Sequence, residues 1–181
     1  MSTPTQLQEA LKEAAPELSG MERWHLTAIG MILTGGNPSY RLENVGTDYS
    51  SCAGAWGVSE LVWGWVSTDL VAQARQAANA WKRSPLRDRM RYVFESPADR
   101  VAWFARLWWH VKEVSSLSKV ARPFSEVYPT SKYLGAAHDL FERYPEFEIM
   151  SLDENRAAGI PWAMIGGVLA VALVVYLILR R

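Results

Sequence analysis

Two stretches carry most of the information in this sequence: residues 26–40, which read LTAIGMILTGGNPSY, and residues 54–61, which read GAWGVSEL. Between Leu26 and Leu33 the apolar residues recur at the i, i+3, i+4, i+7 spacing of one helical face. The run GGNP at 35–38 then ends the helix, because glycine adopts positive φ without strain and Asn-Pro favours a turn. The pattern therefore predicts a helix that stops sharply and leads into a loop.

The flanking sequence predicts further helices. Apolar periodicity and cap residues place them over 5–15, 21–33, 59–81, 96–116 and 131–143. The third is either continuous or broken, with a separate helix capped near Asp69 and running to residue 80. Val101, Phe104 and Trp108 mark a buried stripe on the fourth, and Trp103 and Trp109 lie off that stripe.

The segments between the helices are of two kinds. Residues 39–57 are rich in Gly, Ser, Asn and Asp, which predicts one long irregular loop with room for a short hairpin. Residues 82–91 carry five basic side chains against Asp88 alone, and we interpret them as a solvated turn in preference to a membrane or phosphate site. The folded part is accordingly expected to be mainly α.

Composition excludes several classes of protein. The chain has 181 residues, of which 49% are hydrophobic and 21% charged, too apolar for a disordered chain. Residues 1–156 contain 17 basic and 19 acidic side chains, so we expect no binding to nucleic acid. The three histidines lack the spacing of a metal site and Cys52 is the single thiol, so the sequence predicts neither a metal nor a cofactor.

The carboxy-terminal residues predict a membrane anchor. Ile160 to Leu179 form twenty residues without a charge, enough for a helix to cross a hydrocarbon core about 30 Å thick. Trp162 and Tyr176 stand near the two boundaries, where aromatic belts form. Gly167 belongs to a stripe of small residues spaced by four, which suits self-association of two such helices.

These features predict three parts: a domain at 1–145, a polar spacer at 146–156 and a transmembrane anchor at 157–181. The side of the membrane that the domain occupies stays open. Two terminal arginines favour a cytoplasmic carboxyl end, whereas the lack of an amino-terminal signal resembles a tail-anchored protein. A single-pass protein of a virion membrane or of a host inner membrane would suit both observations.

The two quoted stretches together resemble the soluble lytic transglycosylase family and its goose-type lysozyme relatives. In that family a helix ends in Glu-Ser-Gly-Gly-Asn-Pro, and a loop then leads to Gly-Ala-x-Gly-Leu-Met-Gln at the start of the next helix. The match covers residues 26–61, about a fifth of the chain, and preserves order and spacing. The resemblance implies a lysozyme-like helical domain with one long irregular loop and a peptidoglycan glycan strand as its ligand.

The resemblance also implies which residues contact the ligand. They are Gly35, Asn37, Gly54, Trp56 and Gly57, with Trp56 placed to stack on a sugar ring. For the other tryptophans we expect core packing.

The sequence departs from the family at the catalytic acid. The family glutamate, which protonates the glycosidic oxygen, aligns with Leu33, and the family glutamine aligns with Glu60. A leucine cannot carry a proton, and this cleavage needs a carboxyl of raised pKa. The acids that could replace it are Glu60, the best placed, and then Asp48, Glu43 and Glu22, but a first-turn glutamate such as Glu60 is more typical of a capping acid.

Three functions follow from the sequence. The first is a membrane-anchored, catalytically degenerate transglycosylase-like protein that binds peptidoglycan or has a structural role, for which a phage or membrane-containing virion is a fitting context. The second is an active peptidoglycan-cleaving enzyme that uses Glu60 or a loop acid. The third is a membrane assembly scaffold that oligomerises through its transmembrane helix.

Overall fold

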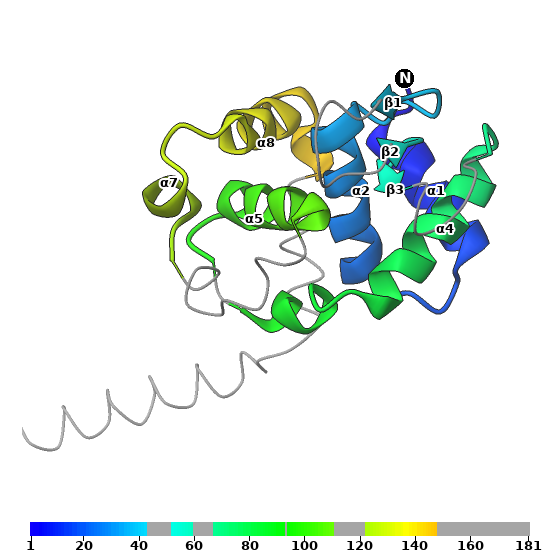
Figure 1. Ribbon diagram of the computed structural model, residues 1–181, viewed down its shortest axis with the longest axis horizontal. Helices are drawn as coiled ribbons and strands as arrows, with labels where there is room; N and C mark the ends of the chain where they lie inside the picture. Colours follow the sequence, from blue (N-terminus) through cyan, green and yellow to red (C-terminus); the bar gives the residue numbers. More distant parts are fainter. Residues whose placement is uncertain (43–51, 60–66, 93, 111–121, 148–181) are drawn as a thin grey trace, which may run out of the picture.

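The computed structural model describes residues 1–42, 52–59, 67–92, 94–110 and 122–147 (Figure 1). This part of the chain is mainly helical, as predicted. Among the described helices, none combines the length and the apolar character needed to cross a bilayer. The predicted anchor at 157–181, including Ile160, Trp162, Gly167, Tyr176 and Leu179, lies outside the described residues.

The helices begin where the cap residues predict. Ser19 and Glu22 form a reciprocal capping box at the start of α2, and the Asp69 side chain accepts a hydrogen bond from Ala72 N at the start of α4. Ser96 caps α5 in the same way, with a proline in the first turn. The helical elements are α1 (Pro4–Ala14), α2 (Gly20–Thr34), α4 (Leu70–Arg83), the 3₁₀ helix η1 (Arg87–Arg91), α5 (Pro97–Trp109), α7 (Phe124–Val127) and α8 (Lys132–Arg143).

A small antiparallel sheet lies between α2 and α4. Its strands are β1 (Arg41–Leu42), β2 (Cys52–Ala53) and β3 (Val58–Ser59), in the order β1-β2-β3. Leu42 pairs with Cys52, and Cys52 pairs with Ser59. The prediction of an irregular loop with a short hairpin therefore missed the third strand, which follows the turn at residues 54–57.

Helix α2 occupies the centre of the fold. It contacts α1 and α4 on one side and α5 and α8 on the other, and the small sheet lies near its carboxy-terminal end (Figure 1). Because neighbours cover it on several sides, α2 is buried almost continuously from Trp24 to Gly30. The sequence between those residues is correspondingly apolar, with His25 and Thr27 as the polar exceptions.

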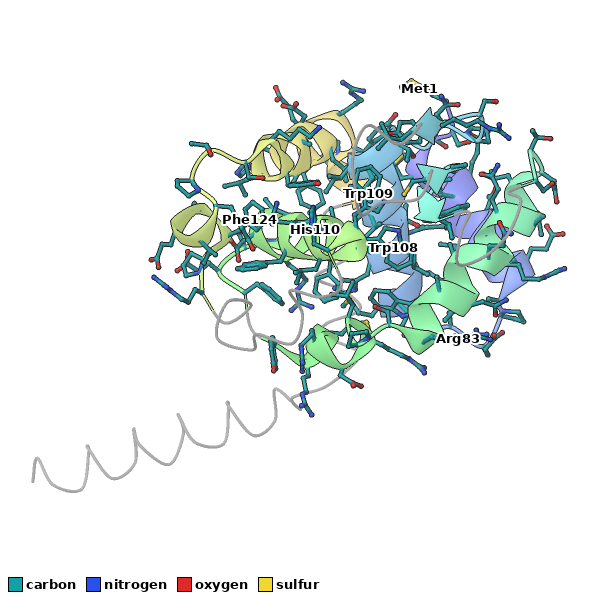
Figure 2. All side chains as sticks on the ribbon, viewed as in Figure 1. Met1, Arg83, Trp108, Trp109, His110 and Phe124 are labelled. Atoms are coloured by element: carbon teal, nitrogen blue, oxygen red, sulfur yellow. The ribbon has the colours of Figure 1, made fainter. Side chains whose placement is uncertain are left out.

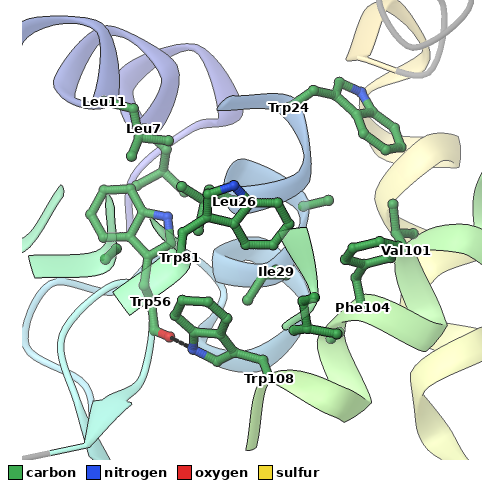
Figure 3. Packing of buried hydrophobic residues seen from close by; sticks show 14 of the residues in the cluster. Leu7, Leu11, Trp24, Leu26, Ile29, Trp56, Trp81, Val101, Phe104 and Trp108 are labelled. Atoms are coloured by element: carbon green, nitrogen blue, oxygen red, sulfur yellow. Dashed lines mark hydrogen bonds between the residues drawn. The ribbon is translucent and has the colours of Figure 1, made fainter. Parts of the chain in front are cut away.

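Tryptophan side chains form much of the core (Figure 3). Trp24, Trp81 and Trp103 are all fully or almost fully buried. The prediction that Trp103 lies off the buried stripe of α5 is therefore wrong. Helix α5 contacts α2, α7 and α8, so more than one of its faces is covered and a single stripe does not describe it.

Candidate functional site

The carboxy-terminal end of α2 is closed by glycine, as predicted. Gly35 and Gly36 both have φ 65°, a left-handed backbone conformation that residues with a Cβ rarely adopt. Gly35 N donates to Met31 O at 3.0 Å. Gly36 O accepts a hydrogen bond from Ser2 N at 3.0 Å, so the beginning of the chain lies against this turn. Figure 2 shows Met1 on the same side of the molecule.

The two stretches identified in the sequence are in contact. Thr34 Oγ1 lies 2.5 Å from Ala55 O and 2.9 Å from Gly30 O, so its proton can be donated to either carbonyl. A Cβ added to Gly30 would stand 2.9 Å from Ala55 O, closer than real side chains approach. The absence of a side chain at Gly30 therefore allows the turn at 54–57 to pack directly on α2.

Gln73 of α4 joins the same segments, and the sequence analysis did not identify it. The side chain is 1% exposed, its Oε1 accepts from Ala55 N at 2.7 Å, and its Nε2 donates to Pro38 O at 2.8 Å and to Ser67 O at 2.6 Å. We refer to Thr34, Gln73 and the turn 54–57 as the α2–turn junction. The one available signal was a polar residue among the buried alanines of α4, and it does not reveal its partners.

Two tryptophans at the end of α5 also bind this turn. Trp108 Nε1 donates to Trp56 O and Trp109 Nε1 donates to Gly57 O, both at 2.9 Å (Figure 3 shows the first bond). Gly57 has φ 56°, and a Cβ there would meet the Trp109 ring at 2.9 Å. Trp108 and Trp109 lie at the end of α5 that faces α2 and the sheet (Figure 2).

The structure corrects the role expected for Trp56. Its indole is 0% exposed and belongs to the core, so neither ring face is available to a sugar. Within the described residues, its Nε1 has no hydrogen-bond partner. Gly54, at φ 78°, is buried as well, and Gly57 packs against Trp109. Of the five expected contact residues, Gly35 and Asn37 are partly exposed.

Leu33 occupies the last turn of α2. It is partly exposed and packs against the core, immediately before the hydroxyl that contacts Ala55. Its side chain is therefore not fully enclosed, and its backbone directly precedes the residue that contacts the turn. Glu60, Glu43 and Asp48, three of the four acids considered as replacements, lie outside the described residues.

Glu22, the fourth acid, lies at the opposite end of α2. Leu33 is eleven residues further along, about 16 Å at 1.5 Å per residue. The Glu22 carboxylate accepts from Ser19 N at 2.8 Å, from Arg87 Nε at 2.6 Å and from Trp81 Nε1 at 3.2 Å. Burial alone raises its pKa, but these hydrogen bonds outweigh burial and hold the pKa below its ordinary value. Glu22 is thus an ionised structural group and does not suit the role of general acid.

Two further buried groups titrate abnormally. His25 Nδ1 donates to Met21 O at 2.8 Å, because a carbonyl oxygen can only accept. Burial lowers the pKa of His25 to about 3, so the ring is neutral at pH 7. Burial raises the pKa of Asp99, whose Oδ1 accepts from Phe124 N at 2.5 Å and so ties α5 to α7. Asp99 is ten residues from Trp109, about 15 Å along α5, and is therefore remote from the α2–turn junction.

A hollow of about 220 Å³ opens beside Gly35, between the ends of α2 and α8. We refer to it as the α2–α8 hollow. It is lined by Met1, Ser2, Thr3, Met31, Gly35, Ala136, Asp139, Leu140, Arg143 and Tyr144. Among the described residues, no three His, Cys, Asp or Glu side chains are grouped so that they could hold a metal ion.

Comparison of the chain with protein-family models, with characterised proteins and with solved structures found no significant match. The case for its function therefore rests on the residues of this chain.

Proposed function

We propose that this protein is a membrane-tethered, lysozyme-like domain that binds a peptidoglycan glycan strand and does not cleave it. The observation that carries the proposal is the α2–turn junction. Two stretches, each similar to one half of the transglycosylase motif, meet through Thr34 and Ala55, which are 21 positions apart in the chain. If the likeness of the two stretches to the transglycosylase motif were accidental, there would be no reason to expect this contact between them.

The loss of cleavage follows from the chemistry at the end of α2. Leu33 has no group that can donate or accept a proton, and protonation of the leaving oxygen is required for this type of glycoside cleavage. Glu22 is held ionised about three turns away. Asp139 lines the nearby hollow but is exposed, without the apolar enclosure that makes a carboxyl a good acid at neutral pH.

The surface offered to a glycan lies around the partly exposed Gly35, Asn37 and Leu33. Trp56 does not belong to this surface, because its ring packs in the core and its carbonyl accepts from Trp108 Nε1. The membrane tether at 157–181 would hold this surface close to a bilayer, on a virion or on an inner membrane.

The proposal is tested with the full-length chain in detergent micelles, incubated with purified peptidoglycan sacculi. We expect co-sedimentation of the protein with the sacculi and no release of soluble anhydro-muropeptides. Release by the unmodified chain would replace the proposal with an active enzyme that uses Glu60 or a loop acid. Neither binding nor release would favour a scaffold that assembles through its membrane helix.

A sharper test restores the acid. Leu33→Glu places a carboxyl in a partly apolar site at the family position, and we expect slow release of anhydro-muropeptides. Leu33→Gln is the matched control, since it has nearly the same shape and cannot transfer the proton. If both variants bind sacculi and neither releases fragments, the groove that the family uses is not preserved here.

A further inference from the structure

The α2–α8 hollow lies where two helices end. Gly35 is the C-cap of α2 and Tyr144 is the C-cap of α8, and both residues line the hollow. The carboxy-terminal end of a helix carries a partial negative charge of about half an electron. Two such ends beside the Asp139 carboxylate favour a positively charged group in the space between them.

The charged side chains of the hollow are available to a ligand. Asp139 and Arg143 are exposed and lie four residues apart on one face of α8. Within the described residues, neither side chain forms a hydrogen bond or an ion pair. The order acid then base would allow an i, i+4 ion pair on this helix, but the two side chains are not paired with each other. Both opposite charges are therefore open to a ligand in the hollow.

The remaining lining sets the size and character of the occupant. Met31, Ala136 and Leu140 supply an apolar wall. A volume of about 220 Å³ holds roughly seven water molecules at about 30 Å³ each. It is smaller than the roughly 300–1,000 Å³ sites of drug-sized ligands and is open to solvent, so it holds a group about the size of one amino acid, and the rest of a larger ligand can extend outside.

We propose that the α2–α8 hollow binds a zwitterionic α-amino-acid group. Asp139 and the two helix ends take the ammonium, the Arg143 guanidinium takes the carboxylate with two parallel hydrogen bonds, and Met31 and Leu140 contact the aliphatic chain. No sugar is needed, so this site goes beyond the glycan surface proposed above. Two sources offer the group: a free amino acid, or the distal end of a diaminopimelate residue in a peptidoglycan stem. The second source alone rests on the proposed function.

The test uses the full-length chain in detergent at low salt, with methionine and leucine methyl groups labelled for NMR. The probes are free leucine, a diaminopimelate stem tetrapeptide, and the same tetrapeptide with lysine, which keeps the ammonium and lacks the distal carboxylate. We expect saturable shifts of the Met31 and Leu140 methyl signals with the zwitterionic probes and at least about tenfold weaker binding of the lysine peptide.

Variants assign the contacts. Arg143→Gln and Asp139→Asn should each weaken binding about fivefold or more, whereas Glu142→Gln and Lys132→Gln, exposed on α8 and outside the hollow, should leave it within about twofold. Binding of leucine and the diaminopimelate peptide alike supports the site, and preference for the peptide assigns the stem as source. No methyl shift with any probe overturns the proposal, as does equal binding by Arg143→Gln and Glu142→Gln. Co-sedimentation with glycan strands stripped of peptide tests the proposed function separately.

Discussion

The two ends of α2 are held in different ways. At its amino-terminal end the buried Glu22 carboxylate accepts hydrogen bonds from Ser19, Trp81 and the half-exposed Arg87. At its carboxy-terminal end, hydroxyl, amide and backbone groups of the α2–turn junction are joined without an ion pair. The first arrangement stabilises the fold, since the Glu22 carboxylate is ionised and accepts hydrogen bonds from its neighbours. The second leaves a glycine-capped surface on which backbone elements approach closely.

This difference shows why the carboxylate of α2 is not suited to act as a general acid. A general acid needs a carboxyl that stays protonated near neutral pH, and the bonds around Glu22 do the opposite. The helix therefore carries its buried charge near its amino-terminal end and an aliphatic side chain, Leu33, in its last turn.

Breaking the amino-terminal end should have the largest effect. Glu22→Ala removes the capping box and leaves Trp81 Nε1 buried without its acceptor and Arg87 without its partner. We expect a loss of about 3–4 kcal/mol in the free energy of unfolding, measured by urea denaturation. Glu13→Ala, exposed on α1, is the control and should change it by less than about 0.5 kcal/mol. A small effect of Glu22→Ala would remove the basis of the comparison.

Breaking the carboxy-terminal end through Gln73 should come next. Gln73→Ala leaves Ala55 N–H and the carbonyls of Pro38 and Ser67 without the buried amide that bonds them. We expect a loss of about 3 kcal/mol. Binding to sacculi should weaken as well, because the turn at 54–57 loses its tie to α4. Gln6→Ala on the exposed first turn of α1 would cost no more than about 1 kcal/mol.

The pH dependence of stability separates the contributions of two buried groups near the amino-terminal end of α2, His25 and Glu22. Burial lowers the pKa of His25 to about 3, so the folded ring stays neutral while the unfolded ring, with a pKa near 6.5, takes up a proton. Its stabilising contribution is complete above about pH 6.5 and falls as the pH is lowered towards 3, by about 2 kcal/mol between pH 7 and pH 5. The pKa of Glu22 lies below its ordinary value, so loss of its contribution comes below this window.

The measurement compares unfolding at pH 7 and pH 5 for the native chain and for His25→Leu. The variant should lack this part of the pH dependence, whatever its absolute stability. An unchanged difference between the two pH values would assign the acid sensitivity to other groups.

The smallest expected effect comes from one substitution made at two helical glycines. Gly30→Ala forces a Cβ against Ala55 O and should cost about 1–2 kcal/mol, although alanine is the better helix former. Gly135→Ala on α8, where a Cβ meets nothing within 4 Å, should stabilise by about 0.5–1 kcal/mol. Thermal melting of the two variants should give shifts of opposite sign. Shifts of the same sign would mean that the turn does not pack closely on α2.

Local signals were read correctly where the chemistry is local. Ser19, Asp69 and Ser96 cap helices, and residues 35–38 end α2, because a cap depends on residues within about four positions. α7 was missed, since four residues are too few for a helical period to appear. The third strand was missed because a two-residue strand is too short for an alternating pattern to appear, even though its partner β2 lies only a turn away.

The basic segment 82–91 shows the same limit. The Lys82 ammonium pairs with the Glu17 carboxylate, Arg87 pairs with Glu22, and Arg89 lies over the Tyr92 ring at 5.5 Å. The predicted solvated turn is therefore largely helical, since α4 runs to Arg83 and η1 spans Arg87–Arg91, and these three basic side chains have partners within the fold. The first two partners come from sixty or more residues earlier, so composition alone could not assign them.

The order of residues alone predicted the longer helices and their caps and put an aliphatic residue, Leu33, in the last turn of α2, because each of these depends on near neighbours or on residue identity. The burial of Trp56, the bridging role of Gln73 and the pairing of Glu22 arose from packing between distant segments. A tryptophan flanked by glycines has the same local sequence whether it lies on a binding surface or in a core. Its environment is set by α5 and α2, which reach it from about fifty residues later and about thirty residues earlier in the chain.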